Sequence, residues 1–202
     1  LSDAIDRLGL PSAVTGLLPR SVRKRIAGRV RTVKLEAAKG RTAARHLCTA
    51  AIEAAAPGDV IVVEQRSGID AAGWGGILSV GAKTKGVAGV IVDGPARDID
   101  EATELGFPVY ARAQTARTAR GRIIEVSTGE PVTIGDVTVS PGDYVLADSS
   151  GVVFIPAAAI ERVIGEAEKI AAREGLMAKA AAAGQPMSQV MGADYEKMLT
   201  EK

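Results

Sequence analysis

The sequence predicts an α/β protein in which a central, partly closed mixed β-sheet is flanked by helices and followed by a long C-terminal helix. The first half of the chain alternates apolar runs of strand length with helical patterns, and residues 122–155 have the pattern of short strands separated by turns. Residues 156–184 carry an apolar stripe at helical spacing. Because 202 residues are hardly enough for two cores, we expect a single domain over residues 1–202.

The N-terminal region predicts one helix and one strand. Residues 2–8 have helical spacing, with Ser2 as the N-cap and Gly9 as the residue that ends the helix. Alternating apolar residues then predict a strand over residues 30–36. The basic side chains of residues 20–31 are expected on the solvent side of this strand or in the loop before it.

An alanine-rich helix is expected over residues 42–56. Cys48, the only cysteine, falls within this helix and is expected to be a small core residue rather than a nucleophile. His46 is the only histidine, and a packing or hydrogen-bonding role is the simpler interpretation of it. One histidine and one cysteine exclude both an internal disulfide and a structural zinc site.

The middle of the chain predicts two buried strands and a glycine-rich loop. Continuous apolar runs at residues 60–63 and 87–92 are typical of strands that are buried on both faces. Between them, the loop at residues 72–76 leads into a helix expected over residues 77–85. After the second strand, Asp93–Pro95 have the chemistry of a turn.

The rest of the chain predicts short elements and then one long helix. A short helix ends at Gly106, and a strand follows over residues 107–112. A long helix begins near Pro156, because proline is favoured in the first turn of a helix. The short strands expected between these elements lie at residues 122–126, 132–134, 137–139, 144–147 and 152–155.

The composition argues against several classes of partner. The formal net charge of +1 gives no overall attraction to nucleic acid or to an anionic membrane. No apolar run approaches the ~20 residues of a membrane helix, and no signal peptide is visible. A single cysteine fits a reducing compartment. We therefore expect a cytoplasmic protein without a membrane partner or a nucleic-acid partner.

The glycine-rich loop is a candidate anion site. Gly73, Gly75 and Gly76 leave backbone N–H groups open just before a helix N-terminus, which suits a carboxylate or a phosphate. The spacing fits neither a phosphate-binding loop nor a dinucleotide fingerprint. Glycines that only permit a tight turn would give the same pattern, so the loop alone favours neither interpretation.

Arg97 and Asp98 follow directly after a buried strand. Open α/β sheets bind ligands at the carboxyl ends of their strands, and a guanidinium beside a carboxylate can hold an anion and a cation. The structural interpretation makes Asp98 the N-cap of the next helix and Glu101 its third residue, close to a capping box. Each residue alone favours the structural interpretation, whereas their combination with the upstream glycine-rich loop favours a site.

The stretch AGWGGILSVGAKTKGVAGVIVDGPARDIDE resembles the signature of the family that contains RraA and the 4-hydroxy-4-methyl-2-oxoglutarate aldolases. SDAIDRLG, APGDVIVVE, LGFPVYAR and VTIGDVTVSPGDYVLADSSGVVFIP resemble its flanking segments, so the resemblance covers nearly the whole chain. It implies a swivelling-type α/β domain that assembles as a homotrimer or a hexamer. It also implies a lyase that needs Mg²⁺ or Mn²⁺ and releases pyruvate from small 2-oxo acids, by retro-aldol cleavage or by decarboxylation.

By position, the resemblance implies that Arg97 contacts the keto and carboxylate oxygens of the substrate. Asp98 would hold the divalent cation, partly through water. An acidic residue from the C-terminal helix of a neighbouring subunit would complete the site, and Glu174 is our candidate for it. These residue types suit the reaction, because release of pyruvate creates an enolate that a cation and a guanidinium stabilise.

The resemblance also implies roles for the glycine-rich loop. Gly75 and Gly76 would let the backbone approach the substrate, and the amides of Gly76, Ile77 and Leu78 would bind its carboxylate. Aldolases of the family commonly carry an acid soon after the first glycine of this loop, and Gly76 stands in that neighbourhood here. The residue that positions water or a proton is therefore not evident in the loop.

Two alternatives compete with a metal-dependent lyase. A Schiff-base mechanism needs a desolvated lysine, whereas Lys83 and Lys85 stand at the end of an expected helix, where solvent reaches them. The other alternative is a non-catalytic regulatory protein that, like RraA, acts on an RNA-degrading endonuclease. The basic stretch at residues 20–31 would suit such a partner, and the presence of both Arg97 and Asp98 favours the enzyme.

Overall fold

The structure is a computed structural model that describes residues 1–10 and 13–192. These residues divide into two compact units, one made from residues 1–10 with 157–192 and the other from residues 13–156. The expectation of one domain over residues 1–202 stays a prediction, because it includes residues that lie outside the described part. None of the described helices is long and apolar enough to cross a membrane.

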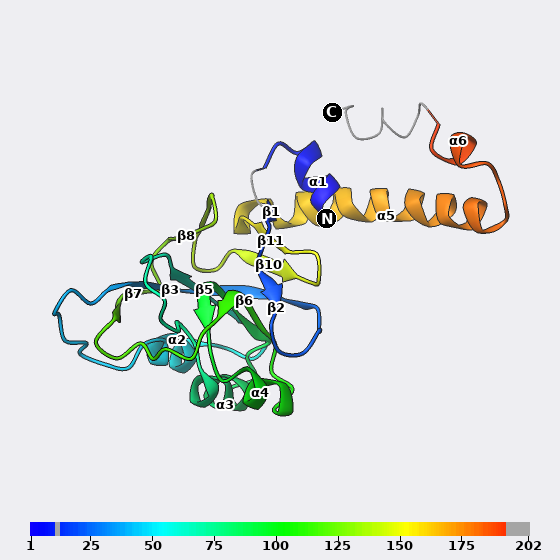
Figure 1. The fold of residues 1–202 in the computed structure, drawn as a ribbon. Coiled ribbons are helices and arrows are strands. Elements are labelled where there is room, and N and C mark those ends of the chain that lie inside the picture. The colour runs from blue at the N-terminus through cyan, green and yellow to red at the C-terminus, as the bar shows by residue number, and fades with distance from the viewer. Residues whose placement is uncertain (11–12, 193–202) are drawn as a thin grey trace. The chain divides into compact units, whose positions relative to one another are not determined.

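A curled, mixed β-sheet of nine strands forms the unit of residues 13–156, as the fold class predicted (Figure 1). The order of the strands is β1-β11-β10-β3-β4-β5-β6-β2, with β7 also paired to β3. A separate hairpin consists of β8 (Val132–Ile134) and β9 (Val137–Val139). The strands of the large sheet are β1 (Ala13–Val14), β2 (Leu18–Pro19), β3 (Ile26–Ala37), β4 (Val60–Gln65), β5 (Gly89–Ala96), β6 (Val109–Gln114), β7 (Ile123–Thr128), β10 (Tyr144–Ala147) and β11 (Val152–Ile155).

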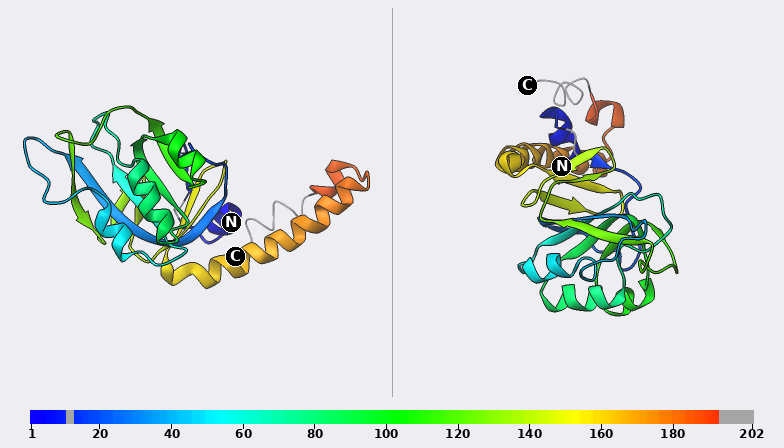
Figure 2. Two further views of the ribbon diagram at one scale, coloured as in Figure 1. Left: turned by 90° about the horizontal axis from the view of Figure 1, so that it is seen from below. Right: turned by 90° about the vertical axis from the view of Figure 1, so that its left-hand side faces the viewer.

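Four parallel strands, β3 to β6, form the centre of this sheet. The helices that connect them are α2 (Thr49–Ala54), α3 (Gly76–Thr84) and α4 (Ile99–Glu104). All three helices lie on the same side of the strands, as Figure 1 and the right-hand view of Figure 2 show. Parallel strands need such crossover connections, and this arrangement brings the carboxyl ends of β4 and β5 to one edge.

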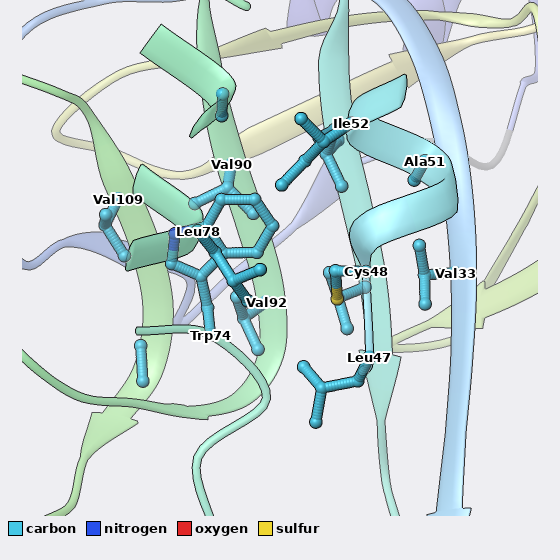
Figure 3. Close-up of a cluster of buried hydrophobic side chains, with 14 of the residues drawn as sticks. Val33, Leu47, Cys48, Ala51, Ile52, Trp74, Leu78, Val90, Val92 and Val109 are labelled. Atoms are coloured by element: carbon cyan, nitrogen blue, oxygen red, sulfur yellow. The ribbon is translucent and has the colours of Figure 1, made fainter. Parts of the chain in front are cut away.

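Alternate residues of the central strands pack into two hydrophobic clusters, one on each face of the sheet. On β4, Ile61 and Val63 face the cluster that contains the helices, whereas Val60 and Val62 face the cluster beneath the β8–β9 hairpin. Figure 3 shows the first cluster, with Trp74, Leu78 and Ile52 packed over the strands. Every residue of β4 is buried, which confirms that the continuous apolar run is a strand buried on both faces.

Strand β3 is longer than its predicted range, residues 30–36, because it pairs with different partners along its length. Its first residues, from Ile26 to Arg29, pair antiparallel with β10. From Val30 to Leu35 it pairs parallel with β4 on the other side, while β7 takes up the end of the strand. Arg29, one of the basic residues before Val30, therefore lies in the strand itself.

The alanine-rich helix begins at Thr49, not at residue 42 as expected. Cys48 precedes it with a left-handed backbone (φ 65°), and its amide donates a hydrogen bond of 2.6 Å to Glu125 Oε2. This contact from β7 prevents the helix from extending towards its N-terminus, so residues 42–48 form a loop despite their high helix propensity. Cys48 is completely buried, as expected of a core residue.

The expected turn at Asp93–Pro95 is wrong, because β5 continues through these residues to Ala96. The register with β6 shifts between Val92 and Pro95, which lets the strand accommodate the proline. Asp93 is buried, and it accepts hydrogen bonds from Arg112 Nε (2.5 Å) and from the Gly135 amide (2.7 Å). Tertiary contacts of the carboxylate therefore replace the local turn that the sequence suggested.

The other unit contains three helices and a 3₁₀ turn within the described residues: α1 (Ser2–Arg7), the turn Ala157–Ala159, α5 (Ile160–Ala182) and α6 (Met187–Val190). Figure 2 shows α5 as one continuous helix, which confirms the long C-terminal helix. Arg7 of α1 and Glu166 of α5 form an ion pair of 2.7 Å. The predicted cap of α1 is wrong, because Ser2 is already its first residue and Leu1 is the N-cap, without a side-chain hydrogen bond.

We predict that Gly94→Ala lowers the free energy of unfolding by about 1–3 kcal/mol, the usual cost of overpacking. The added Cβ would lie 2.5 Å from the carbonyl oxygen of Gln65 on the neighbouring strand. Gly81→Ala in α3 is the control, because its Cβ would meet nothing closer than 3.8 Å and should add roughly 0.5–1 kcal/mol of stability. Urea unfolding measures both, and equal midpoints would contradict a close approach of the two strands.

Candidate functional site

The glycine-rich loop runs beside the end of β5. The Gly73 amide donates a hydrogen bond of 2.9 Å to the carbonyl oxygen of Pro95, and the Arg97 amide donates one of 3.0 Å to that of Trp74. These two backbone hydrogen bonds join the loop to the end of β5. The loop and the residues that follow β5 are therefore held in one fixed arrangement.

Trp74 anchors the loop in the core. Its indole ring is buried and stacks on Phe107, with ring centroids 6.3 Å apart. The indole N–H donates a hydrogen bond of 2.9 Å to Ser79 Oγ in α3, which satisfies the polar end of the ring. Aromatic residues make up only 3% of the chain, so this pair is a large part of its aromatic packing.

Asp98 connects the end of β5 to the N-terminus of α3. Its Oδ2 accepts a hydrogen bond of 2.8 Å from the Gly76 amide, and Arg97 Nε lies 3.5 Å from the same oxygen. The predicted capping role is wrong: Asp98 is the N-cap residue of α4, but its side chain makes no cap hydrogen bond. Its backbone is left-handed (φ 56°, ψ 44°), whereas a capping side chain needs extended backbone, so the carboxylate points to α3 instead.

Close approach, and not a tight turn, explains Gly75 and Gly76. Neither glycine has a left-handed φ. A Cβ at Gly75 would lie 2.9 Å from Asp98 Oδ2, and one at Gly76 would lie 3.2 Å from Asp98 Cβ. The two glycines therefore make room for the Asp98 carboxylate at the start of α3.

Three amides at the start of α3 point away from the helix without an intrahelical acceptor. The resemblance implied that the Gly76 amide binds the substrate carboxylate. In the structure this amide donates to Asp98, so it is not open to a substrate. The amides of Ile77 and Leu78 remain available to an anion. Ile77 is 86% exposed, whereas Leu78 is buried against the core.

A cavity of about 740 Å³ adjoins this loop. Four arginines reach it from separate parts of the chain, and the one acidic residue among its lining residues is Glu125. His46 also lines it, whereas none of the described lysines does. The lining consists of Arg41, Thr42, Ala43, Arg45, His46, Leu47, Thr49, Ala72, Trp74, Gly75, Gly76, Ile77, Leu78, Arg97, Thr118, Ala119, Arg120, Gly121, Ile123, Ile124 and Glu125.

Glu125 offsets only part of the positive charge of the cavity, because it is the single carboxylate among lining residues that include four arginines. Its side chain is only 3% exposed and pairs with Arg45 at 2.8 Å. It also accepts hydrogen bonds from the Cys48 amide and from Thr128 Oγ1, each at 2.6 Å. Arg97 and the other arginines therefore give the cavity a net positive charge that favours anions.

Sequence reasoning found Arg97 and missed the other three arginines. Arg41 and Arg45 stand in the segment expected to be helix, and Arg120 stands in the loop before β7. The only signal in the sequence is the repeat T-A-R-T-A-R at residues 115–120, which no motif relates to a site. The fold brings these residues together, and local patterns do not show such convergence.

Asp98 could hold a divalent cation only together with water and substrate as further ligands. The described residues contain no cluster of three or more carboxylates, histidines or cysteines that could hold a metal. Asp98 Oδ1 accepts no hydrogen bond from the part of the chain that the structure describes, so this oxygen is open. Mg²⁺ often binds through one or two carboxylates together with water and substrate, and such a site fits Asp98.

Other sequence predictions have separate outcomes. Lys83 donates a hydrogen bond to the carbonyl oxygen of Leu105 at the surface, which removes it from the cavity. Glu174 lies on α5 in the other unit and is exposed, so its role stays a prediction. His46 is exposed, with Nδ1 3.1 Å from the carbonyl oxygen of Leu47.

The family of this chain follows from its similarity to known proteins. A family model described as "RraA-like: Aldolase/RraA" matches residues 1–154. The chain belongs to the RraA-like family. It is 32% identical over 138 residues to a protein of Thermus thermophilus named 4-hydroxy-4-methyl-2-oxoglutarate aldolase. The aligned region covers 66% of this chain and 77% of that protein.

The chain is also similar to a much longer protein and to a solved structure. Protein DlpA of Legionella pneumophila is 26% identical over 94% of this chain, and the chain spans only 31% of the length of DlpA. The crystal structure of RraAS2 from Streptomyces coelicolor, described as an unusual member of the RNase ES inhibitor RraA family, superposes with a TM-score of 0.78. The two chains are 27% identical, and the superposition covers 85% of this chain and 87% of RraAS2.

We predict that Cys48 resists alkylation in the folded protein. Burial, and secondly the Glu125 carboxylate, raise the pKa of the Cys48 thiol well above its usual range, and the thiolate is the reactive form. Iodoacetamide at pH 8 should modify the native chain at least about tenfold more slowly than the urea-unfolded chain, as followed by mass spectrometry. Equal rates would mean that the loop of residues 42–48 opens and exposes the thiol.

Proposed function

We propose that this RraA-like chain is a lyase that releases pyruvate from small 2-oxo acids. The two reactions are retro-aldol cleavage of acids such as 4-hydroxy-4-methyl-2-oxoglutarate and decarboxylation of oxaloacetate. The observation that carries the proposal is the convergence of Arg97 with the open amides of Ile77 and Leu78 on a positively charged cavity. The similarity to the Thermus thermophilus aldolase supports the same assignment.

The proposed site binds the 2-oxo acid through its two adjacent oxygen-bearing groups. The substrate carboxylate accepts hydrogen bonds from the Ile77 and Leu78 amides, at the positive end of the α3 dipole. The Arg97 guanidinium donates to the keto oxygen and to one carboxylate oxygen. A guanidinium offers a fixed positive charge in a planar fork that matches a carboxylate.

Arg97 also stabilises the charge that develops in the reaction. In the retro-aldol direction, the hydroxyl on C4 gives its proton to water, the C3–C4 bond breaks, and C4 becomes a carbonyl carbon. In the decarboxylation of oxaloacetate, the bond between C3 and the distal carboxylate breaks and CO₂ leaves. In both cases the electron pair passes to C3 and the keto oxygen, which faces Arg97, and protonation of C3 then gives pyruvate.

The proposed cofactor is a divalent cation, Mg²⁺ or Mn²⁺. Asp98 Oδ1 would hold it, with water and substrate as the remaining ligands. When bound, the cation supplies Lewis-acid polarisation of the keto group. Asp98 Oδ2 meanwhile keeps its hydrogen bond to the Gly76 amide, so that the carboxylate is fixed in orientation.

A neighbouring subunit would complete the site, as in the assembly that the sequence implied. We propose a cytoplasmic homotrimer or hexamer in which Glu174 of one subunit reaches the cavity of the next. Exposed apolar side chains on the C-terminal segment, such as Leu176 and Met187, are consistent with burial between subunits. Analytical ultracentrifugation tests the assembly, and a monomer at micromolar concentration would exclude a shared site.

A regulatory protein is the second candidate function. The similarity to RraAS2, from a family of RNase ES inhibitors, favours it. Gly76 stands where aldolases of the family commonly carry an acid, and Arg23, Lys24 and Arg25 form an exposed basic run. Such a protein would bind an RNA-degrading endonuclease without turning over a 2-oxo acid.

The first test of the proposal is release of pyruvate. Incubation with oxaloacetate, or with 4-hydroxy-4-methyl-2-oxoglutarate, should release pyruvate when Mg²⁺ or Mn²⁺ is present and stop when EDTA removes the cation. Lactate dehydrogenase and NADH report the product continuously. No release from either acid above the protein-free background would favour the regulatory function, and equal rates with and without EDTA would exclude the cation.

The second test separates the roles of Asp98. In Asp98→Asn, the amide oxygen still accepts from Gly76, but it binds a hard cation poorly, so pyruvate release should fall by roughly a hundredfold or more. Melting should shift by only a few degrees, because the loop contact remains. Asp100→Asn is the matched control, since Asp100 is exposed in the first turn of α4 and, unlike Asp98, accepts no hydrogen bond from the Gly76 amide.

Arg97→Lys belongs to the same experiment and should also lose most of the activity, because an ammonium cannot donate the paired hydrogen bonds of a guanidinium. Full activity of Asp98→Asn with Mg²⁺ or Mn²⁺ present would show that Asp98 holds no cation. Equal losses in Asp98→Asn and Asp100→Asn would show a structural effect of the α4 start in place of a role in the site.

A further inference from the structure

The cavity has walls to which the proposed function assigns no role. The proposed function uses Arg97, the start of α3 and Asp98, whereas the cavity of about 740 Å³ extends to segments 41–49 and 118–125. Volumes of roughly 300–1,000 Å³ are typical of sites for drug-sized molecules. The remaining walls therefore offer contacts that the 2-oxo acid end of a substrate would leave unused.

Arg120 is a free cation in these walls. It lines the cavity and makes no hydrogen bond or ion pair with the part of the chain that the structure describes. The other two arginines away from Arg97 are occupied. Arg41 donates to Glu36 (3.1 Å) and to a backbone carbonyl oxygen, and Arg45 pairs with Glu125 (2.8 Å).

Apolar side chains form the floor of the cavity. Leu47, Trp74, Leu78 and Ile123 line it, and each is buried against the core. They come from the loop before α2, the glycine-rich loop, α3 and β7, so four separate segments contribute to the floor. Burial of hydrocarbon against this apolar floor is favourable, whereas a small, fully polar acid would contribute no such burial.

We propose that Arg120 forms a second anion subsite, and that the preferred substrate is a 2-oxo acid whose apolar body carries a distal carboxylate or phosphate. This inference rests on the proposed function, because Arg97 and α3 bind the 2-oxo acid end. The apolar body covers the floor formed by Leu47, Trp74, Leu78 and Ile123. The distal anion pairs with the guanidinium of Arg120 and determines specificity for the leaving part of the substrate.

The loop before β7 supplies a matched control. Two consecutive T-A-R triplets end in Arg117 and Arg120. Both arginines are exposed, but Arg117 lies outside the cavity lining and pairs with Asp70 at 3.4 Å. Arg117→Gln and Arg120→Gln therefore remove the same charge from the same loop, and only the second removes it from the cavity.

Binding of unreactive probes tests the subsite without any turnover. Phenylglyoxylate is a 2-oxo acid with an apolar ring, and 4-carboxyphenylglyoxylate and 4-phosphonophenylglyoxylate add a distal anion to the same ring. Pyruvate lacks both features. Isothermal titration calorimetry, with Mg²⁺ present, gives the Kd of each probe for the wild-type chain and for the two variants.

The wild-type chain should bind phenylglyoxylate more tightly than pyruvate, and one of the two distal anions should tighten binding about tenfold further, the scale of one charge-assisted hydrogen bond. Arg120→Gln should abolish this anion-dependent gain and leave the Kd of phenylglyoxylate unchanged, whereas Arg117→Gln should retain it. The carboxylate and phosphonate probes distinguish the two distal groups.

Three results would overturn the subsite. They are equal affinities of the wild-type chain for phenylglyoxylate and both distal-anion probes, an undiminished gain in Arg120→Gln, and equal losses of the gain in the two variants. Failure of the proposed function looks different, because it is seen as an absence of pyruvate release. An Arg120-dependent gain without pyruvate release would leave the subsite in place on a protein that binds such acids and does not cleave them.

Discussion

The hydrogen bond from the Gly76 amide to Asp98 Oδ2, at 2.8 Å, is the contact on which the candidate site depends. It joins the end of β5 to the start of α3, two segments that are far apart in the sequence. Glycine at residues 75 and 76 leaves room for the contact, because a Cβ would lie 2.9 Å from Asp98 Oδ2 at residue 75 and 3.2 Å from Asp98 Cβ at residue 76. It also holds Arg97 beside the loop, so one interaction determines where the Asp98 carboxylate, the guanidinium and the open amides lie.

This contact changes how the helix N-terminus can be used. Asp98 places a permanent carboxylate at the first amide of α3, where the helix dipole favours negative charge. In the proposed function, a substrate carboxylate would therefore bind to the next two amides and to Arg97. The arrangement keeps the substrate anion beside the carboxylate of Asp98, and a divalent cation between the two would offset their mutual repulsion.

Local patterns in the sequence predicted most of the fold and only part of the site. The bounds of β8, β9, β10 and β11 agree with their predicted ranges, because turns and alternating residues define each strand locally. The start of α2 and the turn at Asp93 were wrong, because the buried contacts of Glu125 and Asp93 come from distant segments. The side-chain direction of Asp98 depends on a left-handed backbone that no residue pattern announces, and the cavity arginines converge only in the fold.

For the proposed lyase, the lining of the cavity would suit decarboxylation better than retro-aldol cleavage. Loss of CO₂ from an ionised distal carboxylate needs a stabilised enolate and no base, whereas a retro-aldol needs an acceptor for the hydroxyl proton. Glu125 is the one carboxylate in the lining, and it is already bound by Arg45, Cys48 and Thr128. Gly76 leaves the loop without an acid, so the proton would have to pass to His46, to water or to a residue of a neighbouring subunit. The groups that this chain itself brings to the cavity stabilise an enolate more clearly than they accept a proton.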